Sequence, residues 1–176
     1  MRVDIRDIKI HNIRFSGVFT LPAAADGTGS WSSPDLTFPH AFTVVKDKSI
    51  TVEGNTTATD ISTSSPMLNI PQELTAWTVS GASKTKKGAD DAKQCYLEIS
   101  CKIQQSGVYL LGSASEYKII YVPFGVIWEP GKRHIYTLIF GGGYTDQGKA
   151  VLNPIQFDAE TTGWVDADNK DVNVKP

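Results

Sequence analysis

The chain has 176 residues, a formal net charge of −2, and 40% hydrophobic and 20% charged residues, which is typical of one globular domain. No stretch is rich in lysine or arginine, so a nucleic-acid partner is not expected, and no run of about 18 apolar residues predicts membrane insertion. Because charges interrupt Met1–Asp7, this start does not resemble a signal peptide, and we expect a cytoplasmic protein or a mature fragment whose leader precedes it.

Alternation with a period of two residues recurs along the chain, and turn residues separate the alternating runs. The first run spans Val3 to Leu21 and loses phase near His11, which predicts a β-bulge or a break into two strands. The apolar positions before the break are Val3, Ile5, Ile8 and Ile10. Further short strands are expected within 42–52, 67–72 and 117–122, with loops over 22–39, 54–66 and 84–93.

Both cysteines belong to one strongly alternating segment, Cys95–Ile103, which predicts a half-buried strand. Cys95 and Cys101 lie on its apolar face. Six residues of strand span about 20 Å, whereas a disulfide needs Cα atoms roughly 4.4–6.8 Å apart. We therefore expect two reduced, buried thiols.

The last third of the chain predicts more strands. Val126–Trp128 leads into Glu129-Pro130-Gly131-Lys132, whose central Pro-Gly pair is typical of a type II turn, and the return strand runs to Phe140. Ile155, Phe157 and Ala159 mark another strand, and a polar tail begins at about residue 166. Short strands without helices predict an all-β fold: a single antiparallel Greek-key β-sandwich domain over 1–176, of the kind seen in immunoglobulin-like proteins.

No set of residues points to catalysis, to a cofactor or to a metal. His11, His40 and His134 belong to no metal-ligand motif and are expected to be surface or strand histidines. Among the tryptophans, Trp77, Trp128 and Trp164 lie in or beside apolar strands and are expected in the core. Trp31 lies in a predicted loop and is the candidate ligand contact.

Three segments, in this order, resemble the fimbrillin-like family. Met67–Gln72 is similar to its hydrophobic-IPQ segment, and Trp128–Tyr136 is similar to its W-x-x-G-K-x-Y-x-Y hairpin, with His134 at the first aromatic position. Ile155-Gln156-Phe157 followed by Trp164 is similar to its terminal strand. The resemblance covers about Val3 to Trp164 and points to the carboxy-terminal domain of such a protein, which the resemblance implies is a transthyretin-like β-sandwich.

The resemblance implies a non-catalytic subunit or adhesin domain of the type V pili of Bacteroidales, or a related surface lipoprotein. The full-length protein would be extracellular and associated with the outer membrane. Its partners would be other pilus subunits, or surface proteins or glycans of host or bacterial cells.

Family members assemble by strand exchange, for which Val3, Ile5, Ile8 and Ile10 form the candidate segment. Without an amino-terminal domain, the isolated chain is expected to be mainly monomeric, because edge charges such as Arg6, Asp7 and Lys9 would oppose association through an unpaired edge. The alternative function is a carbohydrate-binding β-sandwich module that uses exposed aromatic residues near Trp31.

Overall fold

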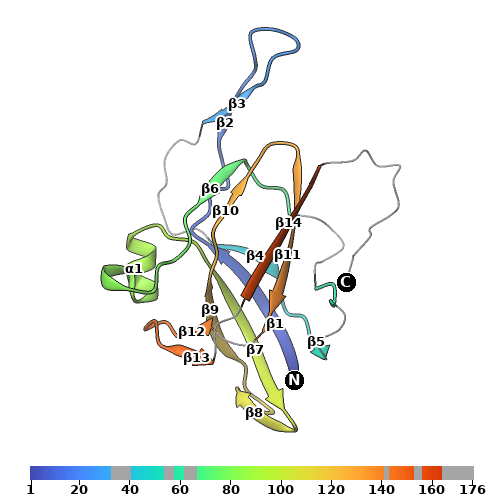
Figure 1. The fold of residues 1–176 in the computed structure, drawn as a ribbon, viewed down its shortest axis with the longest axis vertical. Helices are drawn as coiled ribbons and strands as arrows, with labels where there is room; N and C mark the ends of the chain where they lie inside the picture. The colour runs from blue at the N-terminus through green and yellow to red at the C-terminus, as the bar shows by residue number, and fades with distance from the viewer. Residues whose placement is uncertain (33–40, 54–57, 62–66, 141–142, 153–155, 164–176) are drawn as a thin grey trace.

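The computed structural model describes residues 1–32, 41–53, 58–61, 67–140, 143–152 and 156–163 (Figure 1). Within these ranges the fold is nearly all β, with one eight-stranded sheet and three two-stranded sheets. All of the strand pairings within these sheets are antiparallel. The predicted all-β class with antiparallel sheets is confirmed, and the Greek-key connectivity stays a prediction.

The large sheet has the strand order β13-β12-β9-β7-β1-β4, with β5 also beside β1 and β8 also beside β7. Two ten-residue strands, β1 and β7, form its centre. The bounds of its strands are β1 (Arg2–His11), β4 (Ala41–Val45), β5 (Ile50–Glu53), β7 (Tyr96–Gln105), β8 (Val108–Leu111), β9 (Lys118–Pro123), β12 (Gly143–Tyr144) and β13 (Ala150–Leu152). The strands predicted within 42–52 and 117–122 are therefore confirmed.

The three small sheets are β2 (Val18–Thr20) with β3 (Ser30–Ser32), β6 (Gln72–Leu74) with β10 (Val126–Trp128), and β11 (Lys132–Ile139) with β14 (Gln156–Gly163). The first apolar run does break after His11, as predicted. Gly131 has a φ of +67°, as the third position of a type II turn requires. However, β10 and β11 pair with different strands, so the turn passes the chain from one small sheet to another.

The core lies on both faces of the large sheet, because neighbouring residues of a strand point to opposite sides. On one face, buried side chains such as Ile99 and Ile120 pack with Leu74 and Trp128 of the β6–β10 sheet. Leu138 of β11 also packs against this cluster. On the other face, a second buried cluster joins the residues Trp77, Ala89, Tyr96 and Tyr121.

The central strand β7 is therefore covered on both sides, and the prediction of a half-buried strand is wrong. Tyr96, Ser100 and Lys102, on the face predicted to be polar and open, are all buried. The cysteine prediction is confirmed: Cys95 and Cys101 are buried and free.

The loop predicted over 84–93 is wrong, because the segment forms a short helix, α1 (Lys86–Asp91), after the 3₁₀ turn η1 (Gly81–Ser83). The hydroxyl of Thr85 caps the helix by accepting the N–H of Gly88 at 3.1 Å. Lysine–aspartate pairs four residues apart, such as Lys86–Asp90 at 2.9 Å, support it along one side. The polar composition suggested a loop, but it is the exposed side of a capped helix.

The strand predicted at 67–72 is misplaced. Strand β6 begins at Gln72, directly after Pro71, which has no N–H to donate to a neighbouring strand. Leu68, an apolar residue of the predicted strand, is 79% exposed. The predicted positions that fall outside the described residues are His40, Ile155, Trp164, residues 33–39 of the first loop, much of the 54–66 loop and the tail from 166.

Candidate interaction surfaces

Trp31, the candidate ligand contact, lies in strand β3 and not in a loop as predicted. It pairs with Phe19 across the β2–β3 hairpin, and the two rings lie 5.1 Å apart. The hairpin projects from the end of the molecule (Figure 1) and exposes several large apolar side chains, among them Leu21 at 77%. Trp31 is 43% exposed, whereas Trp77 and Trp128 are buried, as predicted.

A groove of about 380 Å³ lies beside Trp31. Its walls come from three stretches of chain: the link between β1 and β2, strand β3, and the segment that leads into and out of β6. The lining residues are Arg14, Trp31, Ser32, Ile70, Pro71, Gln72, Glu73 and Thr75. This volume falls within the range of about 300–1,000 Å³ that is usual for sites that bind small ligands.

Gln72 joins two walls of this groove. Its side-chain amide accepts the backbone N–H of Arg14 at 2.9 Å and donates to the carbonyl of Arg14 at 3.0 Å. Sequence analysis missed both residues. They are 58 positions apart, and no local pattern in the sequence links them.

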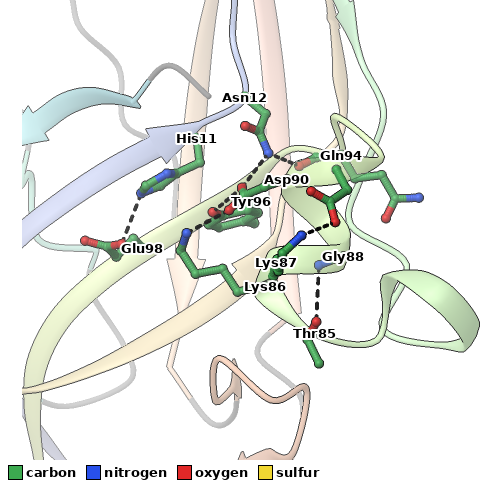
Figure 2. A network of polar contacts seen from close by, with 11 residues as sticks. His11, Asn12, Thr85, Lys86, Lys87, Gly88, Asp90, Gln94, Tyr96 and Glu98 are labelled. Atoms are coloured by element: carbon green, nitrogen blue, oxygen red, sulfur yellow. Dashed lines mark hydrogen bonds and ion pairs between the residues drawn. The ribbon is translucent and has the colours of Figure 1, made fainter. Parts of the chain in front are cut away.

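A network of polar contacts joins β1, β7 and α1 on the face of the large sheet where Tyr96 packs with Trp77 (Figure 2). Nε2 of His11 lies 3.1 Å from a carboxylate oxygen of Glu98, and Lys9 donates to the same carboxylate at 3.0 Å. The hydrogen bond from His11, with that from Lys9, lowers the pKa of Glu98 to about 2 despite its burial. His11 is thus a strand histidine, as predicted, and is buried.

Asp90 of α1 is the second centre of this network (Figure 2). Burial opposes its ionised form, but hydrogen bonds from Lys86, Tyr96 and Asn12 outweigh burial, and the pKa of Asp90 is lowered. Burial, together with the bond to Asp90, raises the pKa of Tyr96. The hydrogen bonds from Asn12 of the β1 end and Tyr96 of β7 to Asp90 fasten α1 to the sheet, so the network acts as structural support.

The candidate strand-exchange residues, Val3, Ile5, Ile8 and Ile10, are all buried in β1. This strand pairs with β7 on one side and with β4 and β5 on the other. Their exchange between subunits stays a prediction, and it would require β1 to leave all three partners.

The charges next to these residues were expected to guard an open edge of the sheet, and that expectation is wrong. Arg6, Asp7 and Lys9 belong to the central strand β1. Arg6 and Asp7 form an ion pair at 2.7 Å, and Lys9 reaches across to Glu98 on β7. Of these contacts, the one between Lys9 and Glu98 joins two neighbouring strands and supports the pairing of β1 with β7.

Among the residues that the structure describes, no group of three or more His, Cys, Asp or Glu side chains is placed to hold a metal ion. In the same part of the chain, no helix has the length and apolar character needed to cross a membrane.

The sequence model of one protein family, described as fimbrillin-like, matches residues 1–164. The chain belongs to the fimbrillin-like family. The match includes all three segments on which the resemblance rests. Fimbrillin-like proteins are structural subunits of fimbriae and not enzymes, and the family belongs to the cell surface. Neither a curated protein nor a solved structure matches this fimbrillin-like chain.

Proposed function

We propose that this chain is a non-catalytic subunit or adhesin domain of a type V pilus, built as a single β-sandwich domain. In the full-length protein it is anchored at the outer membrane and contacts other pilus subunits or surface molecules of other cells. The family match over residues 1–164 is the observation that carries this proposal.

The architecture suits a load-bearing subunit. Strands β1 and β7 share nine registered residue pairs, and small sheets and a helix cover the large sheet. Among the described strands, β4 and β13 end the large sheet and have one neighbour each within it. Such edges are the places where a strand of another subunit can add.

The proposal is tested in the bacterium that makes the protein. A tagged copy should be recovered in fimbriae sheared from the cells and should be labelled along or at the end of the fibres by immunogold microscopy. Recovery only from the cytoplasm, with unlabelled fibres, would contradict the proposal.

A matched pair of variants tests the β4 edge of the large sheet. Thr43→Arg places a cation on the exposed side of β4, where it should hinder strand addition. Thr137→Arg places the same charge on the exposed side of β11, a strand of the separate β11–β14 sheet. We expect Thr43→Arg to lower incorporation into fimbriae and Thr137→Arg to leave it unchanged. Equal incorporation would exclude β4 as the contact.

The isolated chain is proposed to be mainly monomeric, since its longest strands already have partners on both sides. Light scattering across a concentration series should give the mass of one chain. Filaments that form without other subunits would show that this chain contains everything needed for assembly.

A further inference from the structure

We propose that the groove beside Trp31 binds a saccharide, with one sugar ring lying against the indole. This binding activity goes beyond a structural role in the fibre. The groove is formed by described residues of the β2–β3 hairpin, Arg14 and the β6 segment.

The first argument is the position of the aromatic ring. Trp31 is 43% exposed at the wall of a groove, whereas Trp77 and Trp128 are 2% and 6% exposed. Strand pairing and the contact with Phe19 fix its ring in place. A rigid, exposed indole is a flat apolar platform with one N–H at its edge, and the apolar C–H face of a pyranose ring complements it.

The second argument is the set of free polar groups around that platform. In the described part of the chain, the side chains of Arg14, Glu73 and Thr75 make no hydrogen bond or ion pair, although all three line the groove. Arg14 can only donate, Glu73 can only accept, and Thr75 can do both. Sugar hydroxyls donate and accept at once, so they require this mixture. Glu73 and Thr75, two residues apart on an extended segment, lie on the same side of it.

The third argument is that the groove is held in shape without a ligand. Gln72 fixes the backbone of Arg14 to the β6 segment through two hydrogen bonds. Gly17 allows close packing at the base of the hairpin: a Cβ there would lie 3.0 Å from the carbonyl oxygen of Ser32 and 3.2 Å from the Trp31 ring. A preformed site loses less entropy when it binds.

The charge of Arg14, a partly buried residue of the lining, sets the preference among sugars. An arginine with no partner among the described residues gains most from a carboxylate, which it can bind through two parallel hydrogen bonds. Glu73, the other charged residue of the lining, accepts from sugar hydroxyls and opposes a carboxylate beside it, so the acidic group is expected at Arg14. The ligand class is therefore an oligosaccharide that carries one acidic sugar, such as a uronic or sialic acid.

The experiment uses the full chain on an array of neutral and acidic glycans, followed by calorimetric titration of the best ligand. Trp31→Ala should weaken binding at least about ten-fold, which corresponds to about 1.4 kcal/mol. Trp31→Phe should retain part of the affinity. Arg14→Gln should remove the preference for acidic over neutral glycans. The matched control is Leu21→Ala, on the same hairpin but outside the groove lining, and it should bind like the wild type.

Far-UV circular dichroism of each variant separates lost binding from lost folding. The proposal is overturned if the wild-type chain binds no glycan on the array, or if Trp31→Ala binds as tightly as the wild type. Equal binding of acidic and neutral glycans would overturn the role of Arg14. None of these results depends on whether the chain enters fimbriae, so this proposal and the pilus proposal fail independently.

Discussion

Replacing Trp128 by alanine would empty a site in the main core. The side chain is 6% exposed, its ring lies 6.4 Å from that of Phe124, and its Nε1 donates to the hydroxyl of Tyr136 at 2.6 Å. Loss of a buried tryptophan costs about 3–5 kcal/mol through the cavity and the lost burial. Because small domains are stable by only about 5–15 kcal/mol, Trp128→Ala should lose a large share of the free energy of unfolding.

Urea unfolding followed by circular dichroism measures this loss. Trp31→Ala is the matched control, and because that side chain is 43% exposed we expect a change of about 1 kcal/mol or less. Tyr136→Phe keeps the ring but removes the hydrogen-bond acceptor of Trp128, and should cost about 1–3 kcal/mol. Equal losses for Trp128→Ala and Trp31→Ala would refute the reasoning, because the β2–β3 hairpin would then contribute as much as the core.

Three further outcomes are expected. Burial raises the pKa of Cys101 to about 12 and also raises that of Cys95. Both thiols should therefore react slowly with Ellman's reagent in the native protein and rapidly in guanidinium. Fast labelling of the native protein would contradict their burial. The pKa of Glu98 is depressed from 4.5 to about 2, so the stability it contributes is present above pH 4.5 and is lost as the pH falls towards 2. Over this range the urea midpoint of Glu98→Gln should therefore fall less than that of the wild type. Parallel falls of the two midpoints would exclude the effect. Thr85→Ala should destabilise the protein by about 0.5–2 kcal/mol through loss of the α1 cap, while Thr85→Ser should keep most of that stability; equal effects of the two changes would exclude the cap.

Period-two alternation predicted the strands well where one face is apolar. In β11, the residues His134, Tyr136 and Leu138 are half-buried and the residues between them are exposed, as the pattern requires. The same reasoning failed for β7, because a single sequence does not show what covers the second face. Tyr96 and Lys102 appeared to be solvent-facing, and only the fold brings Trp77 and the α1 segment over that side.

The groove could be predicted only in part. The predicted loop over 22–39 indicated that Trp31 stands apart from the core; its side chain is 43% exposed, although it lies in β3 and not in a loop. Its neighbours across the groove come from residues about 40 positions further along the chain, and sheet order cannot be read from local patterns. For the same reason β1, an alternating strand at the start of the chain, was expected at an edge and lies at the centre.

The central place of β1 also governs the order of folding. Lys9 and Glu98, which join β1 to β7, are 89 positions apart, so the first strand to be synthesised must wait for a partner made much later. Contacts between such distant segments form slowly, because closing a long loop costs entropy before the contact stabilises the chain. During this interval the side of β1 that pairs with β7 is open to aggregation. Arg6, Asp7 and Lys9 interrupt that apolar strand with charge, and therefore act as gatekeepers of the nascent chain before they become part of the sheet.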